Sequence, residues 1–339
     1  MQKFTNVVWL LLDSRQLGGI ETHVLQLAEG LKEHNINTHV VFLTNYGPHP
    51  LRVALQKKGI DTISLDGKLF SLWKEIRQQS PALIHTHGYK AGIFGRICAR
   101  LSSTPVVSTY HSGEAKTGRL ALYDCLDRYS AILASKVYVV SPDIGRRLPI
   151  ASELANNFVS TKNLPISNGR KIAFVGRLSK EKGPDIFLRL ARYFPNVLFH
   201  IYGTGPLENK LKRAASSNVC FHGQQSEMSE VWPEVGLLIL PSRFEGLPMA
   251  ALEAMGRAIP VMAFNVGALS NLISNNQNGW ILEPLNLEQL SNQFLEWLEM
   301  KGTRKKLFKR AARNTVESKF SSHVIIPSLI NTYKDLARC

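Results

Sequence analysis

The segment Val175-Gly176-Arg177-Leu178-Ser179-Lys180-Glu181-Lys182-Gly183-Pro184 decides the fold class. The apolar run Ile172–Val175 predicts a buried strand, and Gly183-Pro184 predicts a helix start because proline favours the first helical turn. A strand that ends at a glycine and leads into a helix is typical of parallel α/β sheets. Arg177 and Lys182 would lie beside a helix N-terminus, where two cations can neutralise a pyrophosphate without a divalent metal. A solvated surface loop is the alternative.

Apolar runs and amphipathic segments alternate on both sides of this segment. In Glu21–His34, apolar residues recur at spacings of three and four, which predicts a helix. This alternation is typical of parallel strands joined by crossover helices. It predicts an α/β fold with two doubly wound Rossmann-like domains. The expected strands are Val7–Leu12, Thr38–Thr44, Thr62–Leu65, Leu83–His87, Val106–Tyr110 and Val137–Val140, then Ile172–Val175, Leu198–Tyr202, Val219–Phe221, Leu237–Leu240 and Pro260–Ala263.

Length and turn residues predict the domain organisation. The 339 residues are enough for two domains. Turn formers are dense between Ile150 and Arg170, which predicts an exposed linker. We expect an N-terminal, acceptor-side domain at residues 1–155, a second domain at 156–320, and a C-terminal helix at 321–339 that packs back toward the first domain. Such sheets bind ligands outside the carboxyl ends of their strands, so the site is expected in the cleft across which the two domains face each other.

The composition excludes several classes of protein. With 44% hydrophobic and 20% charged residues, the chain is neither disordered nor a coiled coil. The net charge of +15 implies an anionic partner, which nucleic acid, a phosphate-bearing substrate or an acidic membrane surface would satisfy. Val7–Leu12 is too short for a signal peptide, and no stretch predicts a transmembrane helix, so we expect a cytoplasmic protein. The cysteines at 98, 125, 220 and 339 form no zinc or disulfide pattern.

Two other glycine loops follow predicted strands. Gly18-Gly19 opens a predicted helix and would let a ligand approach the backbone closely, although a simple turn would use the same residues. Gly203 and Gly205 match two positions of a dinucleotide fingerprint, but no small residue stands at its third glycine position. As a nicotinamide site the second loop is therefore weak.

Residues 241–254, with the sequence PSRFEGLPMAALEA, carry a pair of glutamates. Glu245 ends the turn after a strand, and Glu253 follows eight residues later, on roughly the same face of the predicted helix. The amides of residues 246–250 would lie at the first turn of that helix. The two carboxylates are suited to a sugar hydroxyl and a ribose, and the amides to phosphate or sugar oxygens. An N-cap glutamate and an unrelated surface glutamate are the alternative.

Together these motifs resemble the family 4 retaining glycosyltransferases of the GT-B fold, over nearly the whole chain. The sequence departs from the family at residues 267–271, where Asn271 stands in place of a frequent glutamate; this exchange removes a charge but keeps a hydrogen-bonding side chain. The matching segments, in order, are Gly18–Glu21, His85–Gly88, Thr109–His111, Val140-Ser141, Val175–Leu178, Lys182-Gly183, Gly203–Pro206, Glu245–Pro248 and Glu253.

The resemblance implies a nucleotide-sugar donor that is held mainly by the second domain, and transfer with retention of anomeric configuration. Arg177 and Lys182 match the residues that bind the donor diphosphate. Glu245 matches the residue that contacts the sugar ring, and Glu253 the one that contacts the ribose. The residues of the segment that would lie against sugar and phosphate oxygens are Gly246, Leu247, Pro248, Met249 and Ala250.

In the first domain the resemblance implies a smaller set of residues. Gly19 matches the loop glycine near the diphosphate, and His111 matches the histidine beside the donor sugar. His85 and His87 are either structural or acceptor-facing, and Lys90 is placed with them on the acceptor side.

No Asp-x-Asp motif that would hold Mg²⁺ occurs in the sequence. Cations and helix N-termini are therefore expected to stabilise the leaving nucleoside diphosphate, with no metal and no cofactor. A GT-B sugar-nucleotide epimerase would need a different acid-base set, and a phosphorylase would need a lysine-anchored pyridoxal site; neither is indicated. A basic nucleic-acid-binding protein is the alternative from another class.

The positive charges gather in two clusters, and no nucleic-acid module accompanies them, so we expect no nucleic-acid partner. Anionic lipid attracts such clusters, although a solvated helix face would also explain the second one. We expect a saccharide or lipid-linked saccharide acceptor of cell-surface polysaccharide or lipopolysaccharide, and a peripheral contact with the inner face of the cytoplasmic membrane. The first cluster is Lys90, Arg96, Arg100, Lys116, Arg119 and Arg128; the second is Lys301, Arg304, Lys305, Lys306, Lys309, Arg310, Arg313 and Lys319.

Overall fold

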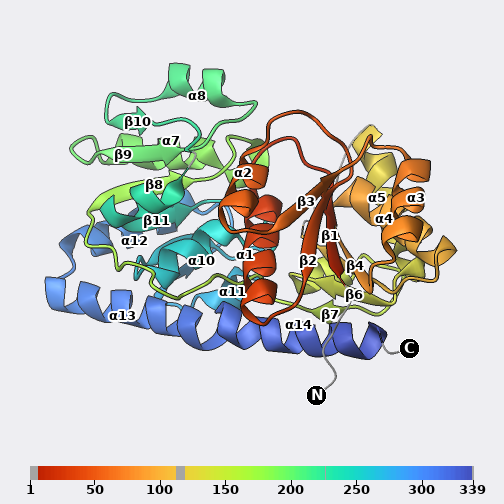
Figure 1. The fold of residues 1–339 in the computed structure, drawn as a ribbon. Helices are drawn as coiled ribbons and strands as arrows, with labels where there is room; N and C mark the ends of the chain where they lie inside the picture. Colours follow the sequence, from red (N-terminus) through yellow and green to blue (C-terminus); the bar gives the residue numbers. More distant parts are fainter. Residues whose placement is uncertain (1–6, 112–118, 226, 338–339) are drawn as a thin grey trace. The chain divides into compact units, whose positions relative to one another are not determined.

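The computed structural model describes residues 7–111, 119–225 and 227–337, and the chain divides into two compact units (Figure 1). Unit 1 comprises Met1–Ser160 and Ser322–Cys339, and unit 2 comprises Thr161–Ser321. These divisions fall five residues and one residue after the expected boundaries at 155 and 320. Lys116 and Cys339 lie outside the described residues.

Unit 1 contains a parallel sheet with the strand order β3-β2-β1-β4-β5-β6-β7. The order reverses between β1 and β4, which makes the carboxyl ends of these strands a topological switch point. The strands are β1 (Val8–Leu12), β2 (Thr38–Phe42), β3 (Asp61–Ser64), β4 (Leu83–His87), β5 (Val106–Tyr110), β6 (Lys136–Val139) and β7 (Glu153–Leu154). The helices are α1 (Gly19–Glu33), α2 (Pro50–Lys57), α3 (Leu69–Gln79), α4 (Tyr89–Leu101), α5 (Arg119–Ser130), the 3₁₀ turn η1 (Ala131–Leu133), α6 (Pro142–Gly145) and α14 (Ser322–Ala337).

The helices of unit 1 cover both faces of its sheet (Figure 1). Leu10 and Leu12 face a core that includes α1, α2 and α14, whereas Trp9 and Leu11 face α3 and α4. Burial on both faces explains why β1 is a continuous apolar run instead of an alternating one. The C-terminal helix α14 packs against α1, where a Cβ on Gly30 would lie 2.7 Å from Ile326. Only glycine allows this approach without displacing the isoleucine.

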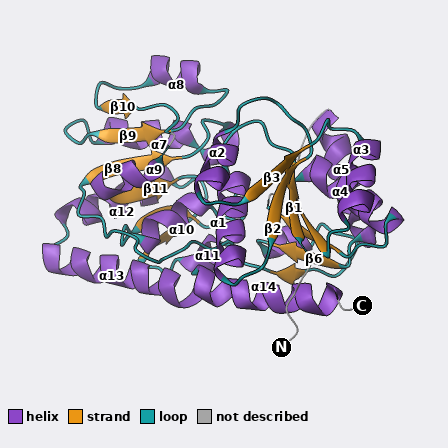
Figure 2. Cartoon of the chain, viewed as in Figure 1, coloured by secondary structure: helices purple, strands orange, loops and turns teal. Residues whose placement is uncertain are grey.

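Unit 2 contains a second parallel sheet, with the order β10-β9-β8-β11-β12-β13 (Figure 2). Its core includes Phe174, Phe187, Phe199, Trp280 and Phe294. The strands are β8 (Lys171–Val175), β9 (Phe199–Tyr202), β10 (Val219–Phe221), β11 (Val235–Leu240), β12 (Val261–Phe264) and β13 (Gly279–Leu282). The helical elements are η2 (Lys180–Lys182), α7 (Pro184–Tyr193), α8 (Glu208–Ala214), α9 (Met228–Val231), η3 (Trp232–Glu234), α10 (Met249–Gly256), α11 (Leu269–Leu272), α12 (Leu287–Glu299) and α13 (Gly302–Lys319).

The two doubly wound sheets confirm the α/β fold class, and each expected strand forms with ends shifted by two residues at most. The short edge strands β7 and β13 were not expected. The prediction of an exposed linker at 150–170 is wrong in part, because β7 lies within it and Phe158 and Val159 are buried in unit 1. This segment pairs with β6 and fills the core, in addition to connecting the units.

Candidate functional site

The loop after β8 in unit 2 is shaped by its glycine at position 183. Gly183 has a left-handed φ of +69°, and a Cβ there would lie 2.0 Å from the carbonyl oxygen of Pro241. Pro184 begins α7 as expected. Lys182 ends the 3₁₀ turn directly before this glycine, while Arg177 is exposed at the start of the loop. The loop thus places two cations near the N-terminus of α7, which favours an anion.

The second glycine loop, residues 202–206, supports this first loop. A Cβ on Gly203 would lie 2.0 Å from the carbonyl oxygen of Gly176, and one on Gly205 would lie 2.6 Å from that of Leu178. The amide of Leu178 donates to the carbonyl of Thr204 (2.8 Å). Both glycines are therefore required for packing between two backbones, which accounts for them without a dinucleotide.

Lys182 and Glu245 form an ion pair between the loop after β8 and the loop after β11. Lys182 Nζ lies 2.6 Å from Glu245 Oε2, and the Ser242 hydroxyl donates to Glu245 Oε1 (2.7 Å). The Glu245 side chain is only 4% exposed, whereas the lysine is 29% exposed. Two residues that the sequence assigned to the diphosphate and the sugar ring are thus brought into direct contact. Ser242, which positions the carboxylate, was missed.

A second ion pair joins the loop after β11 to the first turn of α7, which directly follows the Lys182 loop. Arg243 binds both carboxylate oxygens of Asp185 at 2.8 and 2.7 Å, and its amide donates to the carbonyl of Glu181 (2.7 Å). The arginine lowers the pKa of Asp185 through this hydrogen bonding. A bidentate pair fixes orientation as well as distance, so the Lys182 loop is held in one position relative to Glu245.

The segment Gly246–Ala250 leads into α10, which begins at Met249. Amides in the first turn of a helix have no intrahelical acceptor, and they can therefore bind oxygen atoms of a ligand. Gly267, with φ +62°, packs against this segment, because a Cβ there would lie 2.3 Å from the carbonyl oxygen of Glu245. The amide of Ala268 donates to the carbonyl of Gly246 (2.8 Å). Gly267, in the segment 267–271 where the sequence differs from the family, therefore packs against the Glu245 loop and supports it.

Glu253 lies inside α10, and its Oε2 accepts a hydrogen bond from the indole of the buried Trp232 (2.9 Å). Burial raises the pKa of this carboxyl group. The expectation that Glu245 and Glu253 share a helix face is wrong, because Glu245 lies four residues before the first residue of α10. Glu245 lies in the loop after β11, and Glu253 lies in α10, the helix that follows this loop.

In unit 1, His111 directly follows β5, and its Nε2 shares a 3.0 Å hydrogen bond with Nδ1 of His87. Burial lowers the pKa of His111 to about 4, and it lowers the pKa of His87 as well. Both rings are therefore neutral at physiological pH. Gly19 begins α1, and a Cβ on it would meet nothing within 4 Å. This glycine borders open space at the carboxyl edge of the sheet.

His85 is completely buried, which favours the structural role among the two that the sequence left open. Its Nδ1 bonds the hydroxyl of Tyr333 on α14 (2.5 Å), and its Nε2 bonds Thr109 (2.7 Å). Both ring nitrogens are thus used inside unit 1. Lys90 lies at the start of α4, where it donates to Thr44 (3.0 Å) and lies 3.9 Å from Asp13.

His23, on α1, lies close to His87 and His111 at the strand ends. The sequence analysis missed it. Ring nitrogens of His23, His87 and His111 lie within 4.8 Å of one another, a set of donors that suits a divalent transition metal. His23 Nδ1 and His87 Nε2 have no hydrogen-bond partner among the described residues. The position of His23, four residues after Gly19 on one helix, is the signal that could have identified it.

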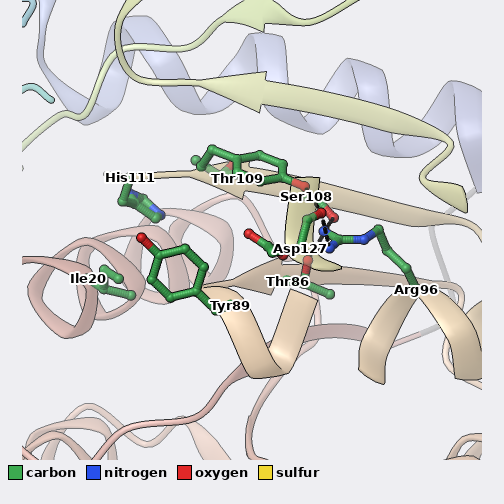
Figure 3. A pocket seen from close by; sticks show the side chains of 10 residues that line it. Ile20, Thr86, Tyr89, Arg96, Ser108, Thr109, His111 and Asp127 are labelled. Carbon is green, nitrogen blue, oxygen red and sulfur yellow. Dashed lines mark hydrogen bonds and ion pairs between the residues drawn. The ribbon is translucent and has the colours of Figure 1, made fainter. Parts of the chain in front are cut away.

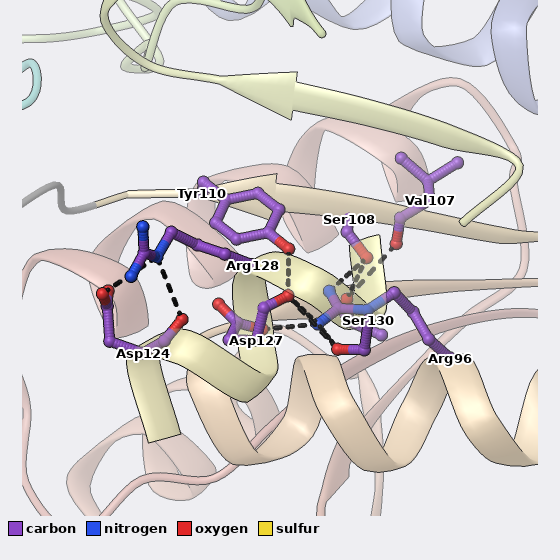
Figure 4. A network of polar contacts seen from close by, with 9 residues as sticks. Arg96, Val107, Ser108, Tyr110, Asp124, Asp127, Arg128 and Ser130 are labelled. Atoms are coloured by element: carbon purple, nitrogen blue, oxygen red, sulfur yellow. Dashed lines mark hydrogen bonds and ion pairs between the residues drawn. The ribbon is translucent and has the colours of Figure 1, made fainter. Parts of the chain in front are cut away.

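One member of the first basic cluster, Arg96, does not lie at the surface. Arg96 is buried and forms an ion pair with Asp127 (2.5 Å), with further bonds to Ser108 and Ser130 (Figure 4). The interpretation of Arg96 as a surface cation is therefore wrong. Among the remaining members, Arg100 is exposed and Arg128 pairs with Asp124.

The second cluster lies on α13, and half of it is used in contacts within unit 2. Lys309 and Arg313 donate to the backbone carbonyls of Ser167 and Leu164. Arg304 pairs with Glu296, and Lys305 lies over the ring of Trp297. Within the described ranges, no helix is both long and apolar enough to cross a bilayer.

Comparisons with known proteins agree with this geometry. The models of Glycosyl transferases group 1 and Glycosyltransferase Family 4 match residues 157–314 and 17–150. A UDP-Gal:alpha-D-GlcNAc-diphosphoundecaprenol alpha-1,3-galactosyltransferase of Escherichia coli is 25% identical over 94% of each chain. The O-antigen biosynthesis glycosyltransferase WbnH of Escherichia coli is 26% identical over 79% of this chain and 84% of its own.

A comparison with solved structures agrees with the observed fold. Anabaena Alr3699/HepE, solved in complex with UDP-glucose, superposes with a TM-score of 0.85 at 18% identity, over 97% of this chain and all of that one. The two family models together cover most of the sequence. The chain is therefore a glycosyltransferase and belongs to the family 4 glycosyltransferases of the GT-B fold.

Proposed function

We propose that this chain is a retaining, metal-independent glycosyltransferase that moves a sugar from a nucleotide-sugar donor to a saccharide or lipid-linked saccharide. The observation that carries the proposal is the Lys182–Glu245 pair, held between two loops at the carboxyl edge of the unit 2 sheet. Lys182 supplies positive charge for the diphosphate, and Glu245 lies next to it for the sugar ring. The Arg243–Asp185 pair keeps these loops in register.

In this proposal, charge on the leaving group is stabilised by the protein alone. The bond between the anomeric carbon and the phosphate oxygen breaks as the sugar becomes oxocarbenium-like. Lys182, Arg177 and the first-turn amides of α10 then stabilise the departing diphosphate, where preorganised donors act most strongly. The acceptor oxygen bonds to the same face of the sugar, and its proton passes to a phosphate oxygen of the leaving group.

The proposal also gives roles to Glu253 of unit 2 and to two residues of unit 1. The carboxylate of Glu253, oriented by Trp232, would bind the ribose. His111 would contact the donor sugar as a neutral imidazole whose ring is oriented by His87. Gly19 borders open space, so a diphosphate could approach the start of α1 closely.

We place the acceptor in cell-surface polysaccharide or lipopolysaccharide biosynthesis, because the similar proteins from Escherichia coli are described as acting on a diphosphoundecaprenol-linked sugar and in O-antigen biosynthesis. An exposed apolar face on unit 1 supports docking on an anionic bilayer. Its members recur every three or four residues and are 48–65% exposed; they are Leu122, Leu126, Tyr129 and Ile132. Apolar side chains at this spacing insert into the lipid interface when nearby cations attract the headgroups.

The experiment that tests the reaction incubates the purified chain with a panel of nucleotide sugars in a chelator. We expect slow hydrolysis of one donor, and NMR of a transferred product that shows the anomeric configuration of the donor. An inverted product would refute the retaining mechanism. Accumulation of an epimerised nucleotide sugar, or of a sugar phosphate in phosphate buffer, would favour the epimerase or the phosphorylase.

The membrane part is tested separately, by sedimentation with vesicles that contain phosphatidylglycerol. We expect binding at low salt, and loss of binding in the variant that combines Leu122→Gln with Leu126→Gln. Leu307→Gln, at an equally exposed position on α13, is the matched control. Equal sedimentation of all three proteins would refute this docking surface.

A further inference from the structure

Unit 1 contains a small cavity at the carboxyl ends of β4 and β5. Its volume is about 30 Å³, which is room for one or two water-sized groups and too little for a sugar ring. In Figure 3, Ile20, Tyr89 and His111 lie on one side of the cavity, and Arg96 and Asp127 lie on the other. Thr86 and Ser108 are among the other lining residues.

The Arg96–Asp127 ion pair forms one wall of this cavity. The arginine is 1% exposed and the aspartate 6%. Arg96 Nη2 donates to Asp127 Oδ1 and to the Asp127 carbonyl (2.9 Å), and Nη1 donates to Ser108 (3.1 Å) (Figure 4). Arg96 Nε is buried and has no hydrogen-bond partner among the described residues. Arg96 and Asp127 give the cavity lining a charged donor and a charged acceptor.

The charges of the cavity determine which polar group fits. The carboxylate of Asp127 balances the positive charge of the Arg96 guanidinium. The wall therefore has no net positive charge that would attract a phosphate. A hydroxyl group both donates and accepts hydrogen bonds, and it can therefore satisfy a carboxylate and a guanidinium together. Burial raises the pKa of Asp127 to about 6, against the opposing effect of Arg96, so the group is mainly a carboxylate at neutral pH.

The position of the cavity connects it to the proposed reaction. His111, which we place beside the donor sugar, lines it, and so does Gly88 at the N-terminus of α4. The cavity also lies at the carboxyl edge of the sheet, next to the switch point between β1 and β4, where doubly wound sheets bind their ligands. A group that enters it would belong to a molecule lying next to His111.

We propose that this cavity is a subsite for one neutral hydroxymethyl arm of the acceptor sugar, bound by Asp127 and Arg96. The assignment rests on the proposed function, because it requires that the chain transfers a sugar. It makes these two residues determinants of acceptor specificity, whereas a purely structural ion pair that joins α4 to α5 would enclose only water.

The test compares acceptors that differ only in this arm. Octyl β-D-galactoside and octyl β-D-glucoside are assayed against their 6-deoxy counterparts, with a donor that the chain hydrolyses. For the wild type we expect kcat/KM for the acceptor to be about 10- to 100-fold higher with the hydroxymethyl group, the effect of one hydrogen bond to a charged group. For Asp127→Asn we expect this preference to fall to within about threefold. Asp124→Asn, on the same helix and paired with Arg128 and Arg147, should retain the full preference.

The outcomes separate this inference from the proposed function. Equal use of hydroxymethyl and 6-deoxy acceptors by the wild type overturns the subsite, and so does an unchanged preference in Asp127→Asn. The subsite is also overturned if the chain hydrolyses a donor but no octyl glycoside acts as an acceptor or as a competing inhibitor. Absence of any donor hydrolysis contradicts the proposed function itself. Because the preference is a ratio within one protein, partial unfolding of a variant does not affect it, and the wild-type comparison stands if Asp127→Asn does not fold.

Discussion

Replacement of Lys182 by methionine should affect turnover and stability by different amounts. If the ammonium stabilises the departing diphosphate, its loss should lower kcat by about 100- to 1000-fold, the usual effect of removing one preorganised donor. The same change leaves the 4% exposed Glu245 with Ser242 as its remaining partner. Breaking a buried pair costs about 3–5 kcal/mol and an exposed pair about 0–1. With a lysine that is 29% exposed, we expect a loss of about 1–2 kcal/mol in the free energy of unfolding.

The assay combines the rate of donor consumption with urea unfolding of the same preparations. Lys180→Met is the matched control, since this lysine is exposed in the same loop. The combination of Lys182→Met with Glu245→Gln should recover most of the stability while turnover stays low. Turnover of Lys182→Met within about threefold of the wild type would refute the electrostatic role. Recovery of turnover together with stability in the double variant would show that the lysine only holds the loop.

Three further predictions follow from the site geometry. Gly183→Ala should lower both stability and donor binding, because its Cβ would lie 2.0 Å from the carbonyl oxygen of Pro241; unchanged melting and KM would contradict this reason. The free energy of unfolding should fall as pH decreases from about 6.5 to 4, because burial lowers the pKa of His111 to about 4 and the unfolded chain binds the proton first; His111→Asn should reduce this fall by up to about 3 kcal/mol in urea titrations across that range. Transfer in excess EDTA should proceed at the untreated rate, and loss of activity that Mg²⁺ or Mn²⁺ restores would contradict metal independence.

The fold could be predicted because its signals are local. The central strand Val8–Leu12, for example, is a continuous apolar run, and a glycine-containing loop and an amphipathic helix follow it. The edge strands β7 and β13 were not predicted. β7 has two residues, and β13 follows the polar stretch 274–278, so only pairing with a neighbouring strand defines them.

The site could be predicted only where its residues form a motif. Lys182 and Glu245 were identified by their own loops, but their ion pair joins positions 63 residues apart. The burial of His85 depends on Tyr333, which lies 248 residues away. Arg96 was interpreted as a surface cation, since nothing near it in the sequence shows that Asp127 on the next helix neutralises it.

The measurement that tests the central claim most directly is the consumption of nucleotide sugars by the purified chain in EDTA, followed by NMR for the wild type and for Lys182→Met. The account predicts that the wild type slowly releases sugar from one donor and that Lys182→Met releases it about 100- to 1000-fold more slowly. If no donor in a panel of UDP-, GDP- and ADP-sugars is consumed, or if both proteins consume it equally, the proposal of a metal-independent transferase with Lys182 at the diphosphate is contradicted.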